Sequence, residues 1–137
     1  MVYVGTYTNG KSEGIYLYSL DASTGELTLV NTTKVTNNPS FLALDPQRKF
    51  LYAVNEVGEF AGKKGGGVSA FSINPKTGNL TLINQQSSLG GAPCFITVDK
   101  QGKNVLVANY SGGNVAVFPI AANGGLGEAS HMEQHTG

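Results

Sequence analysis

The chain has 137 residues, of which 40% are hydrophobic and only 13% charged, and its nine basic side chains balance nine acidic ones. That length is typical of a single domain. A neutral charge balance provides no basic surface for the phosphates of a nucleic acid or for an anionic membrane, so we expect neither partner. Cys94 is the only cysteine, which excludes an intrachain disulfide and a zinc site built on cysteines.

The start of the chain carries no basic segment followed by an apolar one, and no apolar run reaches the length of a membrane span. We therefore expect a cytoplasmic protein. A periplasmic location stays open if a signal peptide has been removed.

The first unit of the chain, residues 1–37, contains three runs rich in β-branched and aromatic residues, which Gly, Asn and Asp separate. Such runs are typical of short strands. They predict strands at Val2–Tyr7, Gly14–Leu20 and Leu27–Thr32.

The second unit, residues 38–91, contains four such runs and a long glycine-rich loop, Val57–Gly66. Asp45 followed by Pro46 favours a type I turn after the first run. The predicted strands are Phe41–Asp45, Phe50–Asn55, Gly67–Ile73 and Leu80–Gln85.

The third unit, residues 92–137, again contains four runs. They predict strands at Phe95–Asp99, Asn104–Tyr110, Asn114–Ile120 and roughly Gly127–Gln134. No part of the chain shows the sustained periodicity of a helix.

The three units are copies of one another. Pro39–Asp45 matches Pro93–Asp99 at an offset of 54 residues, and Ser23–Leu29 matches Lys76–Leu82 at an offset of 53. Repeated four-stranded meanders of about 40–50 residues are the blades of β-propellers. The chain contains no Trp, so the blades are not of the WD40 type. The sequence thus predicts an all-β chain, residues 1–137, that forms one partial propeller domain.

Several segments together resemble the seven-bladed lactonase family, the propeller-type 6-phosphogluconolactonases. They include Val2–Thr8, Asn38–Ala43, Leu51–Glu56 and Gly65–Phe71. The resemblance covers essentially the whole chain in order. It implies hydrolysis of a sugar lactone without a metal or other cofactor. It also implies that this chain is about two and three-quarter blades of a seven-bladed ring.

The chain departs from the family at two places. It ends at Gly137, before the histidine- and arginine-bearing segments that the resemblance associates with the active centre. Many relatives also carry His after the Pro-Cys pair of the third unit, where this sequence has Phe95.

Four side chains are candidates for a lactonase site. Glu56 ends an apolar run and precedes the longest loop, where a desolvated carboxylate can act as a general base; the alternative is a solvated loop carboxylate. Asn55 and Asn109 occupy equivalent positions and can either bind sugar hydroxyls or close the strand end through local hydrogen bonds. Lys63 lies in a glycine-rich loop that can reach a phosphosugar or simply be a solvated loop.

The remaining motifs give no site. His131 and His135 lie four residues apart in a region that alternates like a strand and so face the same side, but two histidines alone make a poor metal site, and we expect no metal. The sequence therefore predicts hydrolysis of a sugar lactone, with the 137-residue chain inactive alone. The alternative is a non-catalytic propeller segment that binds a ligand or assembles with copies of itself or with the rest of the ring.

Overall fold

The computed structural model describes residues 1–34 and 36–137, which form strands and connecting loops without a helix. The first sheet has three strands in the order β1 (Val2–Val4), β2 (Ile15–Leu20) and β3 (Leu27–Thr33). The second has four, in the order β4 (Leu42–Leu44), β5 (Phe50–Asn55), β8 (Gly67–Ile73) and β9 (Leu80–Ser87). The third also has four: β10 (Pro93–Val98), β11 (Asn104–Asn109), β12 (Asn114–Pro119) and β13 (His131–Gln134).

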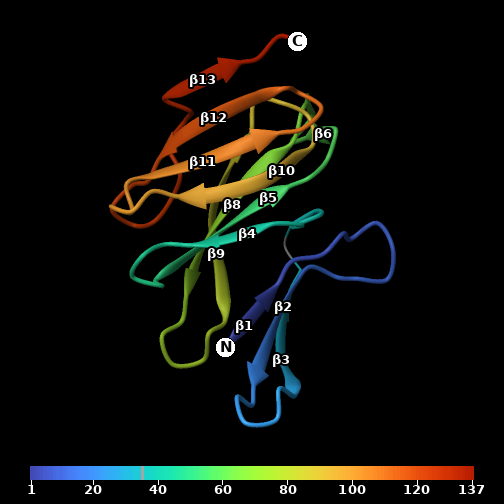
Figure 1. Cartoon of the computed structure of the whole chain (residues 1–137), viewed down its shortest axis with the longest axis vertical. Helices are drawn as coiled ribbons and strands as arrows, with labels where there is room; N and C mark the ends of the chain where they lie inside the picture. The colour runs from blue at the N-terminus through green and yellow to red at the C-terminus, as the bar shows by residue number, and fades with distance from the viewer. Residues whose placement is uncertain (35) are drawn as a thin grey trace.

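Every pairing between neighbouring strands of these three sheets is antiparallel. Along the long axis of the molecule the second sheet lies between the first and the third, with the N-terminus low and the C-terminus high (Figure 1). The all-β prediction is confirmed for the described residues, and each predicted strand overlaps an observed one. In residues 1–34 and 36–137 no helix is long and apolar enough to cross a membrane.

Two regions differ from the sequence prediction. The loop after β5 contains a small hairpin of β6 (Glu59–Phe60) and β7 (Lys63–Lys64). The Phe60 ring of this hairpin lies against Gly67, where a Cβ would be only 2.7 Å from the ring, so glycine leaves the room that the ring occupies.

The last strand begins at His131, later than predicted. The segment before it leaves the sheet because Leu126 is buried between the second and third sheets. The side-chain amide of Asn84 donates to the main-chain oxygen of Leu126 at 2.7 Å, and its side-chain oxygen accepts from the main-chain amide of Leu126 at 2.9 Å. The side-chain amide of Gln86 donates to the same main-chain oxygen of Leu126 at 3.0 Å. Burying a leucine side chain contributes about 1.5–3 kcal/mol.

The apolar core lies between neighbouring sheets. β5 is buried on both of its faces because it packs against the first sheet on one side and the third on the other. Leu51 and Ala53 belong to the same core cluster as Ile15, whereas Tyr52 and Val54 belong to a cluster with residues of the third sheet. A strand buried on both faces reads as a continuous apolar run, as this one does in the sequence.

The turn between β4 and β5 in the second sheet and the turn between β10 and β11 in the third sheet are held by the same hydrogen bonds to an aspartate. Asp45 accepts main-chain hydrogen bonds from Lys49 at 2.6 Å and Phe50 at 2.9 Å. Asp99 accepts the equivalent bonds from Lys103 at 2.7 Å and Asn104 at 3.3 Å. In both sheets the aspartate side chain thus satisfies main-chain amides of the turn.

Candidate functional site

Glu56 follows β5 directly, at the end of the second sheet that faces away from the Asp45 turn, and its side chain is half-buried. Its Oε2 atom accepts a hydrogen bond of 2.8 Å from the hydroxyl of Tyr7 and a short one from the hydroxyl of Ser40. Tyr7 follows β1, and Ser40 precedes β4. Three segments that are distant in the sequence therefore meet at one carboxylate.

Asn38 fixes the backbone on both sides of this contact. Its main-chain oxygen accepts from the amide of Glu56 at 3.1 Å, and its side-chain amide donates to the main-chain oxygen of Glu56, also at 3.1 Å. The side-chain oxygen of Asn38 accepts from the amide of Thr8 at 2.7 Å. Asn38 adopts a positive φ of 43°, which asparagine tolerates better than most residues. One side chain thus holds the segment that carries Tyr7 against the segment that carries Glu56.

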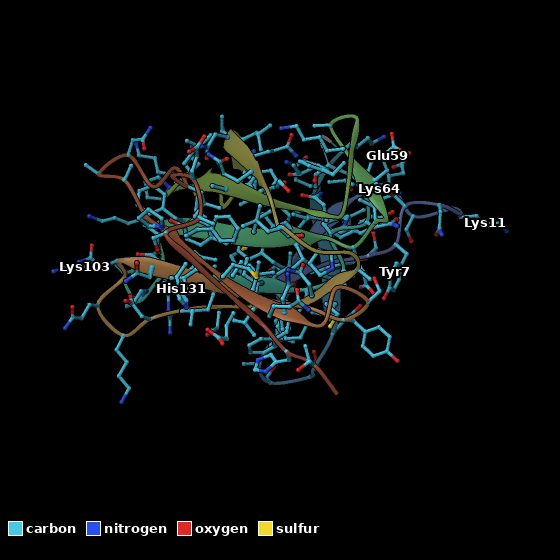
Figure 2. The ribbon with its side chains drawn as sticks, turned by 90° about the horizontal axis from the view of Figure 1, so that it is seen from above. Tyr7, Lys11, Glu59, Lys64, Lys103 and His131 are labelled. Carbon is cyan, nitrogen blue, oxygen red and sulfur yellow. The ribbon has the colours of Figure 1, made fainter. Side chains whose placement is uncertain are left out.

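The carboxylate of Glu56 shifts the pKa of the Tyr7 hydroxyl. The hydrogen bond to the carboxylate raises the pKa of Tyr7 above its ordinary value of 10.0, because the bond favours the protonated phenol, and desolvation adds to this effect. The Tyr7 side chain remains 53% exposed. In the view from above, Tyr7 lies on the same side of the molecule as Glu59 and Lys64 of the small hairpin (Figure 2).

Two aromatic rings meet near the first strands of the second and third sheets, and one of them, Phe41, directly follows Ser40 in the chain. Phe41 and Phe95 occupy equivalent positions in the second and third sheets, and their ring centroids are 5.1 Å apart with a 52° tilt. Each ring remains more than two fifths exposed. Phe95 therefore contributes an apolar surface here together with Phe41.

Asn55 and Asn109 both point into the protein. Asn55 is fully buried; its side-chain amide donates to the hydroxyl of Thr36 and to the main-chain oxygen of Asn37, and its oxygen accepts from Ser69 at 2.7 Å. Asn109 is almost fully buried.

The side-chain amide of Asn109 donates to the main-chain oxygen of Ser88 and to the side-chain oxygen of Asn114, at 2.8 Å each. These contacts favour the local role for both asparagines over contact with a sugar. Binding of sugar hydroxyls by either residue stays a prediction.

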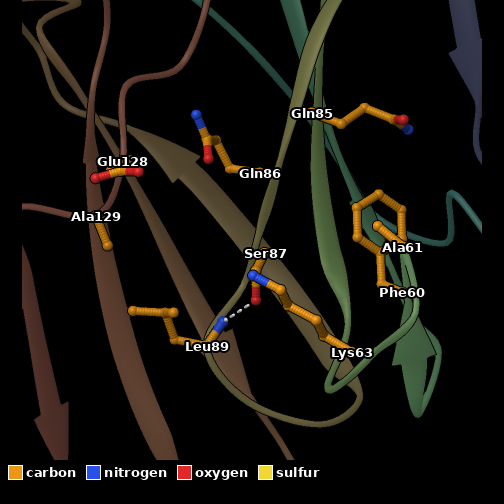
Figure 3. A pocket seen from close by; sticks show the side chains of 9 residues that line it. All are labelled: Phe60, Ala61, Lys63, Gln85, Gln86, Ser87, Leu89, Glu128 and Ala129. Carbon is orange, nitrogen blue, oxygen red and sulfur yellow. Dashed lines mark hydrogen bonds between the residues drawn. The ribbon is translucent and has the colours of Figure 1, made fainter.

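Lys63 faces a different region. It lines a cleft of about 650 Å³ between the small hairpin, the end of β9 and the loop before β13. Figure 3 shows Lys63 extending from the hairpin toward Ser87, with Glu128 and Ala129 on the opposite wall. Glu56 does not line this cleft. The structure therefore does not bring the predicted lysine and the predicted carboxylate into one pocket.

The described residues contain no group of three or more side chains suited to hold a metal ion. His131 lies 3.3 Å from the carboxylate of Glu133 on the exposed last strand. This arrangement is an ordinary surface contact between neighbouring side chains of a strand.

Comparison with known proteins decides the family. The profile described as "Lactonase, 7-bladed beta-propeller" matches residues 1–137. The chain belongs to this lactonase family. The family resemblance and the propeller fold predicted from the sequence are thereby confirmed.

Among its relatives, a 6-phosphogluconolactonase of Bacillus subtilis is 38% identical over 136 residues, which are 98% of this chain and 37% of that protein. A solved structure from Bacteroides fragilis, of a protein proposed to be a 6-phosphogluconolactonase, is 40% identical with a TM-score of 0.90; the match covers 98% of this chain and 36% of that one. The periplasmic gluconolactonase of Pseudomonas aeruginosa is 36% identical with a TM-score of 0.88, over 97% of this chain and 38% of that one. The chain thus spans less than two fifths of the length of each of these relatives.

Sequence reasoning missed three residues of the Glu56 cluster, namely Tyr7, Ser40 and Asn38. All three lie in segments that carry the family resemblance, but nothing in their spacing indicates that they meet at one carboxylate. A comparison of the repeats offers one sequence signal that sets Asn38 apart from its equivalent in the third unit. Asn38 and Ala92 are equivalent and both precede Pro, and both adopt a positive φ, yet only Asn38 has a polar side chain.

Proposed function

We propose that this chain is the N-terminal part of a propeller that hydrolyses a sugar lactone such as 6-phosphogluconolactone to the open acid. Membership of the lactonase family and the names of the Bacillus and Bacteroides relatives support the reaction. The observation that carries a site on this chain is the half-buried carboxylate of Glu56, to which two hydroxyl groups are bound.

In the proposed reaction Glu56 is the general base. Its carboxylate takes a proton from water while the water oxygen attacks the carbonyl carbon of the lactone. The bond between that carbon and the ring oxygen then breaks, and the ring oxygen takes up a proton to give the hydroxy acid. A general base positioned in this way accelerates a reaction by about 10²–10⁴-fold. Lys63 faces a separate cleft, so any contact it makes with a phosphosugar would lie at a distance from this step.

A second candidate is a non-catalytic propeller segment that binds a ligand or assembles. The edge of β1 favours it, since within the described residues β1 pairs only with β2 and leaves a row of backbone groups available to another strand. In the complete propeller that row would pair within the ring. We propose a cytoplasmic location for the protein, although the Pseudomonas relative is named a periplasmic enzyme.

Ring opening separates the two candidates because it releases a proton. The assay follows proton release from 6-phosphogluconolactone at constant pH, with this chain and with a propeller completed by the C-terminal blades of a relative. We expect the chain alone to be inactive and the completed propeller to turn over at about 1–1000 per second, as enzymes typically do. A completed propeller that folds but does not exceed spontaneous hydrolysis would favour the non-catalytic segment.

A further inference from the structure

We infer that Tyr7 and Ser40 are positioning residues that hold Oε2 of Glu56, so that Oε1 is the atom that receives the proton from water. This inference rests on the proposed function, because it assigns the geometry of the base in that reaction. Neither residue was expected from the sequence to belong to a site.

The two hydroxyl groups bind the same carboxylate oxygen. Tyr7 donates to Oε2 at 2.8 Å and Ser40 donates to Oε2 at a shorter distance. No described side chain or amide donates to Oε1. A carboxylate bound at one oxygen cannot rotate freely about its terminal bond, and hydrogen bonds to an ionised group are among the stronger ones in proteins. With Oε2 held, Oε1 of Glu56 keeps a fixed position.

The donors come from different parts of the fold. Tyr7 lies in the loop between β1 and β2 of the first sheet, whereas Ser40 and Glu56 belong to the second unit. Asn38 ties these segments together through Thr8 and through the backbone of Glu56. The geometry of Glu56 therefore depends on the docking of the first sheet against the second.

The repeat shows that this cluster is not a general feature of the fold. Tyr7, Glu56 and Tyr110 occupy the same position in the three units, one residue after Thr6, Asn55 and Asn109. Tyr110 is 82% exposed, and its hydroxyl has no hydrogen bond to a described residue. Of these three equivalent positions, only that of the second unit carries a carboxylate. A contact needed merely to close a blade would be expected in every unit.

The first experiment uses the chain itself and needs no activity. Ultraviolet absorbance reports ionisation of tyrosine, and the difference between the wild type and Tyr7→Phe isolates the titration of Tyr7. We expect Tyr7 to titrate above its ordinary value of 10.0, and Glu56→Gln to bring its pKa back toward that value. An unchanged Tyr7 titration in Glu56→Gln would overturn the inference, because it would mean that the two groups do not interact.

The second experiment uses the propeller completed with the blades of a relative. Tyr7→Phe and Ser40→Ala each remove one donor, and we expect each to lower kcat, with the double variant reduced about 10- to 100-fold and KM little changed, since a misplaced catalytic group costs about that much. Ser40→Thr keeps a hydroxyl and should recover most of the loss. Tyr110→Phe is the matched control and should leave kcat unchanged. Circular dichroism of each variant reports whether it is folded.

The outcomes separate this inference from the proposed function. If Glu56→Gln abolishes turnover but the folded double variant keeps the full kcat, the positioning role is wrong and the general base stands. If Glu56→Gln keeps full turnover, the proposed base is itself wrong. A loss that appears only in KM would also overturn the positioning role, because it would place the two hydroxyl groups in ground-state binding.

Discussion

The interior contacts of Ser69 lead to a quantitative prediction about stability. Its hydroxyl donates to the side-chain oxygen of Asn55 at 2.7 Å and accepts from Gln85 at 2.9 Å. The repeat aligns Ser69 with Ala116 of the third unit. There the side-chain oxygen of Asn109 is buried and has no hydrogen-bond partner among the described residues. Ser69→Ala should leave Asn55 in the same condition as Asn109.

The expected cost follows from the burial of these groups. Both Ser69 and Asn55 have no exposed surface, so water cannot replace the lost bond without a rearrangement. A buried acceptor left without a partner costs about 1–3 kcal/mol. A change of 1 kcal/mol shifts the melting temperature by roughly 2–8 °C for domains around this size. We therefore expect Ser69→Ala to melt several degrees lower.

Thermal unfolding followed by circular dichroism measures this effect, with urea unfolding as a second probe. Ser72→Ala is the matched control: it lies on the same strand, β8, and its side chain makes no hydrogen bond to a described residue. We expect the control to stay within about 0.5 kcal/mol of the wild type. If Ser69→Ala were as stable as the control, the account of these asparagines as structural ties would be refuted.

Ala116→Ser should offer the oxygen of Asn109 a donor and raise the free energy of unfolding by up to about 1 kcal/mol, measured by urea unfolding; a loss of stability would show that the site has no room for the hydroxyl. Burial raises the pKa of Tyr3 and Tyr52, so their contribution to stability is fully present below about pH 10 and should be lost as the pH rises further; melting temperatures that stay constant from pH 8 to 12 would contradict this. Gly124→Ala should destabilise the chain because a Cβ there would lie 2.2 Å from the ring of Phe50 and the backbone has a φ of 86°, and a melting curve equal to that of the wild type would disprove the close contact. The edge of β1 should make the isolated chain self-associate at tens of micromolar, and sedimentation that shows only monomer would refute this.

Much of the fold follows from local sequence patterns. The alternation of apolar runs with Gly, Asn, Asp and Pro placed most strands within a few residues, because turn chemistry such as that of Asp45 acts locally. The last strand was predicted too early, since the burial of Leu126 depends on Asn84 in a neighbouring sheet. A contact over 42 residues leaves no trace in the local pattern.

The candidate site was predictable only in part. Glu56 was chosen because it ends an apolar run and precedes the longest loop, and its role as a base stays a prediction. Its partners were not identified, since Tyr7 reaches it across 49 residues and from another sheet. For the two equivalent asparagines the sequence left two roles open, binding of sugar hydroxyls and closure of the strand end by local hydrogen bonds. Their contacts with the neighbouring connection favour the second role.

Whether Glu56 is the general base of a lactonase is tested most directly by one comparison of variants. In the completed propeller, the rate of proton release from 6-phosphogluconolactone is measured for Glu56→Gln and for Glu59→Gln, a neighbouring exposed glutamate on the small hairpin. Glutamine keeps the size of the side chain and removes the base. The account predicts a loss of about 10²–10⁴-fold in kcat for Glu56→Gln and none for Glu59→Gln. Equal rates for the two folded variants would contradict it.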